Sequence, residues 1–179
     1  LHFGQIAILY PLSEEHHYLS LSSTLNHKKH PKGSNAMVKG HMARIYPTQK
    51  QQNILNTIFN TSRFAYNYFL AERVRSYKED GVSLSYNKTS SMLTALKREK
   101  DHLWLNDSDS MALQESLRDL DKAYQNFFKG NAGFPRFHSK RNKQSYRTRN
   151  QKDSIRVVGN TVKLPKVGFV KFKGLKPFE

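Results

Sequence analysis

The stretch SMALQESLRDLDKAYQNFFKG, residues 110–130, carries the clearest helical pattern in the chain. Its apolar residues recur three or four positions apart and so fall on one face of a helix: they are Leu113, Leu117, Leu120, Tyr124, Phe127 and Phe128. Gly130 stands where such a helix commonly ends in a left-handed cap. The stretch therefore predicts an amphipathic helix that begins at Ser110 and packs against a core.

The residues before this stretch also repeat at helical spacing. Thr48 and Gln51 make a capping-box pair, and apolar residues follow at helical spacing as far as Gly81. Asn60 and Thr61 interrupt the pattern, so we expect two consecutive helices or one broken helix. A further helix is expected over roughly residues 87–100.

Beyond Gly133 the pattern changes to the period of two that is typical of strands. SIRVV and TVKL flank the turn Gly159-Asn160 and predict a hairpin, and GFVKF predicts a following strand. Another short strand is expected to end at Tyr46-Pro47. The prediction is thus an α+β fold with helices flanked by strands, whereas residues 1–36 show no sustained period and are expected to be disordered.

The charge of the chain points to a polyanionic partner. Lysine and arginine outnumber aspartate and glutamate by 30 to 14, a net charge of +16. Residues 129–179 hold fourteen of those cations and two carboxylates. The absence of cysteine excludes a disulfide framework and a thiolate zinc site. The apolar run 6–12 is interrupted by Pro11, so we expect neither a signal peptide nor a membrane span.

The tract of residues 133–152 contains no carboxylate and interleaves cations with Phe134, Phe137 and Tyr146. Cations can hold phosphates while rings stack on bases, so the tract predicts a nucleic-acid-binding surface. The alternative is a solvated basic loop whose aromatic residues anchor it to the core. The cations are Arg136, Lys140, Arg141, Lys143, Arg147, Arg149 and Lys152.

Two other patterns favour structural interpretations. The acids Asp107, Asp109, Glu115, Asp119 and Asp121 lie at the start and along one face of the predicted helix, where they suit caps and ion pairs better than a metal site. Residues 49–80 suggest a helix-turn-helix, but the aromatic residues of the second helix fit a core better than a recognition surface.

Six segments taken in order resemble one family. They are RIYPTQKQ, SRFAYNYFLAER, LSYNKTSSMLTALKRE, WLNDSDSMALQESLRDLDKAYQNFFKG, GFPRFHSKR and VKLPKVGFVKF. Their order and approximate spacing are similar to those of TnpB (OrfB) proteins of bacterial insertion sequences, which are relatives of compact type V CRISPR effectors. The resemblance runs from Met37 to about Gly174.

The resemblance implies an RNA-guided DNA endonuclease architecture. Residues 37–47 and 133–179 would supply the strands of a wedge domain of β-barrel type, residues 48–132 the inserted helical recognition domain, and residues 1–36 a mis-assigned upstream segment. The wedge part would grip guide RNA, and both parts would read a short motif in the target-adjacent DNA. The implied motif readers are Tyr86, Ser90, Ser110, Met111, Gln114, Gln151 and Lys152. Gln114 suits a bidentate contact to adenine and Met111 suits the methyl group of thymine.

The family's RuvC-type nuclease domain would follow this segment, and the 179 residues end before it. We therefore expect a truncated protein without catalytic activity and without a cofactor, because the magnesium ions belong to that domain. The expected partners are guide RNA and DNA in the bacterial cytoplasm and no membrane. A weak binder, a competitor of intact copies, an inert remnant and one half of a nuclease completed by a separate chain all fit the sequence. The alternative from another class is a free-standing helix-turn-helix regulator of DNA.

Overall fold

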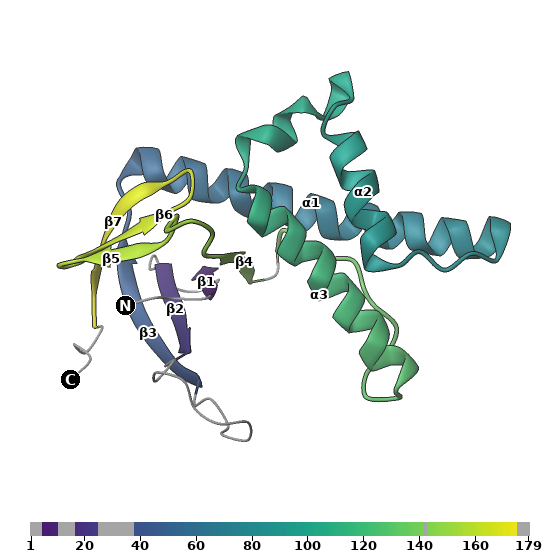
Figure 1. Ribbon diagram of the computed structural model, residues 1–179, viewed down its shortest axis with the longest axis horizontal. Helices are drawn as coiled ribbons and strands as arrows, with labels where there is room; N and C mark the ends of the chain where they lie inside the picture. Colours follow the sequence, from purple (N-terminus) through teal and green to yellow (C-terminus); the bar gives the residue numbers. More distant parts are fainter. Residues whose placement is uncertain (1–4, 11–16, 25–37, 142, 175–179) are drawn as a thin grey trace. The chain divides into compact units, whose positions relative to one another are not determined.

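The computed structural model describes residues 5–10, 17–24, 38–141 and 143–174 (Figure 1). The chain divides into two compact units. The sheet unit, residues 1–55 and 143–179, is built on β-strands, and the helical unit, residues 56–142, is built on helices. The mixed architecture agrees with the predicted α+β class.

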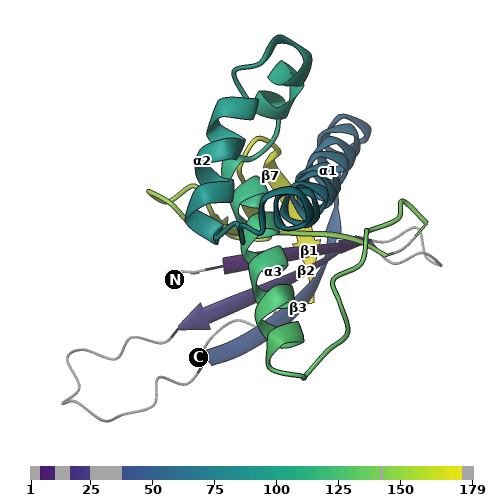
Figure 2. The same ribbon diagram turned by 90° about the vertical axis from the view of Figure 1, so that its right-hand side faces the viewer.

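Seven antiparallel strands form one sheet in the described part of the sheet unit, in the order β4-β1-β2-β3-β7-β6-β5. The order is linear with β4 and β5 at its ends, so no barrel closes among these residues. Figure 2 shows β1, β2 and β3 as neighbouring strands. The bounds are β1 Gln5–Tyr10, β2 His17–Thr24, β3 Val38–Tyr46, β4 Gln144–Arg149, β5 Arg156–Val158, β6 Thr161–Leu164 and β7 Gly168–Lys173.

The expectation that residues 1–36 are disordered is wrong for the two segments of that region that the structure describes. β1 pairs with β2 and with β4, and β2 pairs with β3. Ile8 and Leu19 are fully buried, so both strands contribute to the core. Local periodicity missed them because their partners lie elsewhere in the chain. The other residues of 1–36 lie outside the described residues.

The predicted C-terminal hairpin is confirmed. Val158 pairs with Thr161 across Gly159-Asn160, and Gly159 adopts the positive φ of +54° that this two-residue turn requires. β7 then pairs with β6 and with β3, which joins strands from both ends of the chain. The buried residues of these strands alternate along β6 and β7, as the period of two predicts.

α1 (Gln49–Asp80) is one continuous helix, so the expected interruption at Asn60-Thr61 is wrong. Thr61 is buried, and its Oγ1 lies 3.0 Å from the carbonyl oxygens of Thr57 and Ile58, so the hydroxyl is satisfied inside the helix. The predicted start is confirmed, because Thr48 N donates to Gln51 Oε1 at 3.0 Å and Gln51 N donates to Thr48 Oγ1 at 3.4 Å. Gly81, at φ +66°, ends the helix as predicted.

The helical unit continues with α2 (Tyr86–Leu96), the 3₁₀ helix η1 (Lys100–Asp107) and α3 (Ser110–Phe128). The predicted helix over 87–100 is therefore shorter than expected, and α3 is confirmed. Residues of all four elements build one core. Its fully buried members are Ala65 and Phe69 of α1, Leu105 of η1, and Leu113, Leu117 and Leu120 of α3.

Candidate nucleic-acid interface

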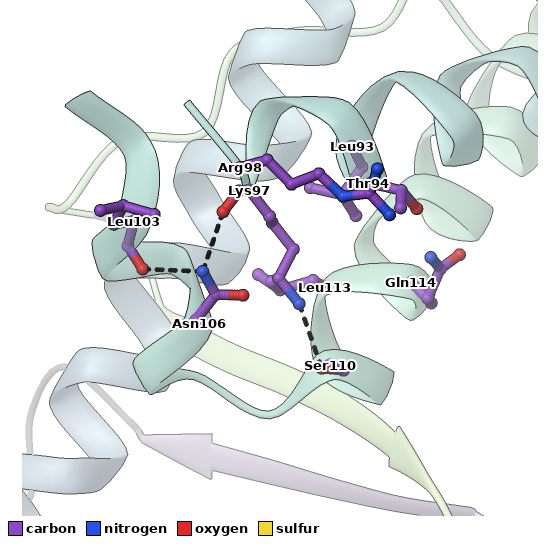
Figure 3. Close-up of a pocket in the computed structure, with 9 residues that line it drawn as sticks. All are labelled: Leu93, Thr94, Lys97, Arg98, Leu103, Asn106, Ser110, Leu113 and Gln114. Atoms are coloured by element: carbon purple, nitrogen blue, oxygen red, sulfur yellow. Dashed lines mark hydrogen bonds between the residues drawn. The ribbon is translucent and has the colours of Figure 1, made fainter. Parts of the chain in front are cut away.

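A hollow of about 490 Å³ lies on the helical unit between the end of α2, η1 and the start of α3. Ser110 and Gln114, two of the predicted motif readers, line it together with the cations Lys97 and Arg98 (Figure 3). No carboxylate belongs to the lining, so its formal charge is positive. We call this hollow the α2–α3 groove. Its lining residues are Leu93, Thr94, Lys97, Arg98, Leu103, Asn106, Ser110, Leu113 and Gln114.

Gln114 is held at one end of the groove by two hydroxyl groups of α2. Tyr86 Oη donates to Gln114 Oε1 at 2.8 Å, and Ser90 Oγ donates to the same oxygen at 3.0 Å. Three predicted motif readers thus form one cluster. A carbonyl oxygen has two lone pairs, and here both are used. The Nε2 amide of Gln114 makes no hydrogen bond to any described residue, so it remains a donor.

This geometry corrects the expected bidentate contact to adenine. That contact needs Gln114 Oε1 to accept from the adenine amino group while Nε2 donates to N7. Oε1 already accepts from Tyr86 and Ser90, so Gln114 offers donors and no free acceptor.

The ring of Tyr86 is itself fixed. The guanidinium carbon of Arg118 lies 4.4 Å from the centre of that ring, in a cation–π contact. Arg118 Nε also pairs with the buried carboxylate of Glu115 at 3.4 Å. Tyr86, which orients Gln114 from α2, is therefore held by contacts to Arg118 and Glu115 of α3.

The start of α3 is anchored to α1 within the helical unit. Asp109 is the N-cap, and its Oδ1 accepts from Met111 N at 3.0 Å. Thr61 Oγ1 and Ser108 Oγ lie 2.7 Å apart and share a hydrogen bond, and both residues are buried. These contacts fix the position of Ser110, which begins the helix. Met111 is half-buried and does not belong to the lining of the groove.

Among the groove residues that sequence reasoning missed are Lys97, Arg98 and Asn106. Lys97 Nζ donates to Ser110 Oγ at 3.3 Å, so it crosses from α2 to α3 (Figure 3). Asn106 Nδ2 donates to the carbonyl oxygens of Lys97 at 2.9 Å and Leu103 at 3.1 Å, which ties η1 to the end of α2. The adjacent cations Lys97 and Arg98 were a visible signal, because a basic pair at a helix end is suited to phosphate.

The first part of the predicted basic tract forms a loop on α1. Asn67 Nδ2 donates to His138 O at 2.9 Å, and His138 N donates to Asn67 Oδ1 at 2.8 Å. The rings of Tyr66 and His138 stack with centres 3.8 Å apart. Partial burial lowers the pKa of His138, and the positive charge of Arg63 lowers it further. The cations Arg136, Lys140 and Arg141 of this loop are exposed.

The second part of the tract lies in the sheet unit, on β4. Arg147 and Arg149 alternate with Tyr146 and Thr148, which are buried. Side chains alternate between the two faces of a strand, so the arginines lie on the opposite face from Tyr146. Tyr146 is 3% exposed, so its predicted role as a stacking surface is wrong. Lys143 precedes β4 and is exposed.

Gln151 and Lys152 lie on a tight loop of the sheet unit. Asn150 Oδ1 accepts from Ile155 N at 3.0 Å, and Asn150 Nδ2 donates to Ile155 O at 3.0 Å. Lys152, at φ +48°, and Asp153, at φ +55°, adopt left-handed conformations. The hydrogen bonds of Asn150 hold the loop in a backbone conformation that L residues rarely adopt. Gln151 and Lys152 are exposed on this loop.

Three of the five acids singled out in the sequence have structural roles. Asp109 caps α3, Glu115 pairs with Arg118, and Asp121 pairs with Arg73 at 2.8 Å. Within the described residues, no three histidine or acidic side chains come together in a way that could hold a metal ion.

Comparisons with known proteins give the family. A model described as "Helix-turn-helix domain", of the OrfB type of IS605 elements, matches residues 37–81. The described part of that match consists of β3 and the single helix α1. "Putative RNA-guided DNA endonuclease InsQ" of Escherichia coli (strain K12) is 30% identical over 130 residues, which cover 73% of this chain and 32% of InsQ.

Two further relatives have different lengths. "Putative RNA-guided DNA endonuclease" of Streptomyces pristinaespiralis is 34% identical over 55% of this chain and 24% of its own length. "Virulence protein VsdF" of Salmonella dublin is 34% identical over 60% of this chain and 98% of its own length. The chain thus spans about a third of InsQ and nearly all of VsdF.

The α+β fold and the match to the OrfB-type helix-turn-helix model place the chain in the class of proteins that insertion sequences encode. The chain belongs to the TnpB (OrfB) family. In the part that the structure describes, none of the helices is long and apolar enough to cross a membrane.

Proposed function

We propose that this chain is a nucleic-acid-binding module of the TnpB family. In this proposal the sheet unit and the helical unit correspond to the wedge and recognition parts, which hold guide RNA and read target-adjacent DNA. Two relatives are named as RNA-guided DNA endonucleases, and the net charge of +16 supports a polyanionic partner.

The observation that carries the DNA-reading role is the fixed amide of Gln114. Its Oε1 accepts hydrogen bonds from Tyr86 and Ser90, and its Nε2 keeps N–H groups that can donate to DNA. Gln114 lines the same groove as Lys97 and Arg98. In the major groove of DNA, guanine N7 and O6 and thymine O4 are acceptors. Gln114 therefore selects guanine or thymine, while the two cations hold the phosphate backbone.

Selection from a randomised duplex DNA pool tests this role. The wild-type chain should enrich a motif with guanine or thymine at one position, and Gln114→Ala should lose about tenfold of the preference there. Gln49→Ala, a change of an exposed glutamine in the sheet unit, is the matched control and should keep the motif. Identical motifs from wild type and Gln114→Ala would remove the groove from the proposal.

The proposal is confined to binding. Metal-dependent cleavage of a phosphodiester needs carboxylates that hold the metal ions. The carboxylates Asp109, Glu115 and Asp121 are engaged in a cap and in ion pairs. Cleavage is therefore assigned to no described residue.

The second candidate is a DNA-binding regulator that acts without RNA through the helix-turn-helix segment. The family model matching residues 37–81 favours it. The exposed Arg75 of α1 does not, because it is paired with Glu72 at 2.7 Å and with Glu79 at 3.4 Å. Arg75→Gln should leave duplex DNA affinity unchanged under the first proposal and weaken it under the second, by filter binding without RNA.

A further inference from the structure

A second hollow on the helical unit has five aromatic rings in its lining. It has a volume of about 520 Å³, within the range of small-ligand sites, and lies between the last turns of α1, residues 83–85, the second half of α3 and the loop after it. It shares no lining residue with the α2–α3 groove. We call it the aromatic hollow. Its rings are Tyr77, Tyr124, Phe127, Phe128 and Phe134.

These rings pack against one another at the rim and remain open to solvent. Tyr124 and Phe134 lie edge to face with centres 5.6 Å apart, and Phe127 and Phe134 do so at 5.3 Å. Phe128 is nevertheless 73% exposed and Tyr77 is 67% exposed. Large rings left open around a hollow mark a binding surface more than a core.

Arg73 brings a buried guanidinium to the lining of the same hollow. Its side chain is 7% exposed, and one guanidinium nitrogen pairs with Asp121 Oδ1 at 2.8 Å. The guanidinium also lies over the ring of Tyr124, 5.0 Å from its centre. Arg73 Nε is buried, and no described residue accepts a hydrogen bond from it. The buried Nε cannot be reached from the hollow, so the guanidinium contributes positive charge to the lining and not a donor for a ligand.

The charge of the hollow fits an anionic chain. Its only carboxylate, Asp121, is neutralised by Arg73, and Lys78 adds a cation that the structure leaves exposed. Tyr77 and Ser83 add hydroxyl groups that make no hydrogen bond to any described residue. The lining thus combines stacking rings, a buried guanidinium, a rim cation and rim hydroxyls.

We propose that the aromatic hollow binds an unpaired nucleobase of RNA. Every base has a face that stacks on aromatic rings, and the phosphates that flank it can meet the rim cation Lys78. A purely apolar peptide would leave Lys78 without a counter-charge. RNA exposes unpaired bases in loops and bulges, and its 2′-hydroxyl can bond to the rim hydroxyls of Tyr77 and Ser83, which DNA cannot match.

The site is separate from the DNA-reading groove. Gln114 and Tyr124 are ten residues apart on α3, which places them about 15 Å apart along the helix axis. The inference therefore does not depend on what the groove reads. A variant of the hollow can be tested while Gln114 is intact.

The test uses the full chain and a short single-stranded RNA that carries 2-aminopurine at one position. Phe128→Ala should weaken binding about tenfold and abolish the quenching of 2-aminopurine that stacking causes. The same RNA with an abasic site at that position should bind wild type and Phe128→Ala equally. Phe169→Ala, a change of an exposed phenylalanine in the sheet unit, is the control and should bind like wild type.

Phe128 is exposed, so the Phe128→Ala chain should fold, and its thermal unfolding checks this. Tyr77→Phe is the second variant, because it keeps the exposed ring and removes the rim hydroxyl. It should weaken binding of the RNA and leave binding of a DNA strand of the same sequence unchanged.

Several results would overturn the proposal. Equal RNA affinity of wild type and Phe128→Ala would exclude stacking in the hollow, and equal binding of DNA and RNA strands would exclude the choice of RNA. Self-association that disappears in Phe128→Ala, with RNA affinity unchanged, would assign the hollow to a second copy of the chain. Loss of duplex selection in Gln114→Ala is measured on a different ligand, so the two proposals can fail separately.

Discussion

Asn67 and His138 are joined by two hydrogen bonds although they lie 71 positions apart in the sequence. The side chain of Asn67 pairs with both backbone groups of His138, as a neighbouring strand would, at 2.9 Å and 2.8 Å. Tyr66, the preceding residue on α1, stacks on the His138 ring. One turn of α1 therefore positions the loop that carries Arg136, Lys140 and Arg141.

Asn67→Ala should release this loop. Loss of two hydrogen bonds is expected to lower the free energy of unfolding by about 1–2 kcal/mol, because they are partly accessible to water. Amide exchange of residues 136–141 should accelerate more than that of the α3 core. RNA affinity should fall as well, because a mobile loop loses conformational entropy when it becomes ordered on binding.

The control for that experiment is Asn56→Ala, which changes an exposed asparagine on the same helix. Asn56→Ala brings the same gain in helix propensity as Asn67→Ala, and Asn56 makes no contact with the loop. Unchanged amide exchange at His138 in Asn67→Ala would show that stacking on Tyr66 alone holds the loop.

His138 should make stability depend on pH. Its folded-state pKa is lowered by partial burial and by Arg63, so the unfolded chain binds more protons in the window below the ordinary value of about 6.5. Stability is therefore fully present above that value and is lost as pH falls through the folded-state pKa. His138→Phe keeps a ring for Tyr66 and removes the titration. The denaturant midpoint of this variant should change less with pH than the midpoint of wild type. Identical pH profiles of the two proteins would contradict the assignment.

Much of the local structure could be predicted because the signals are local. The spacing of Leu113, Leu117 and Leu120 predicts α3, Gly159-Asn160 predicts the hairpin, and Thr48 with Gln51 predicts the start of α1. In each case the residues that decide the conformation lie within a few positions of one another.

The errors arose where distant contacts decide. Asn60 and Thr61 have modest helix propensity, but Thr61 pairs with Ser108 in the core and α1 continues. β1 was missed because its partners β2 and β4 come from separate parts of the chain. Tyr146 could have been assigned correctly, because alternation with Arg147 already puts it on the opposite face of a strand.

The loop that carries Arg136, Lys140 and Arg141 should make a measurable electrostatic contribution to RNA binding. Arg136 and Arg141 are exposed, and each phosphate contact to a single strand contributes about 0.7 to the slope of affinity against salt. The double variant Arg136→Gln with Arg141→Gln should reduce that slope by about 1.4. Lys50→Gln with Lys100→Gln removes the same charge from exposed positions elsewhere and should leave the slope closer to that of wild type. Equal slopes for the two double variants would make the loop a bystander.

Gln51 performs two tasks that a glutamate cannot combine. Its Oε1 accepts from Thr48 N at 3.0 Å, which caps α1, and its Nε2 donates to the carbonyl oxygens of Phe169 at 2.8 Å and Val167 at 3.5 Å. Glutamate is a good capping-box residue and favours a helix start, so propensity alone predicts that Gln51→Glu is neutral or stabilising. The structure predicts the opposite, because the carboxylate would face two carbonyl oxygens without a proton to donate. Gln51→Glu should lower the free energy of unfolding by about 1–3 kcal/mol in urea titrations near neutral pH, at least as much as Gln51→Ala. If Gln51→Glu were as stable as wild type, the cap would outweigh the contact to β7, and the start of α1 would not depend on the strand beside it.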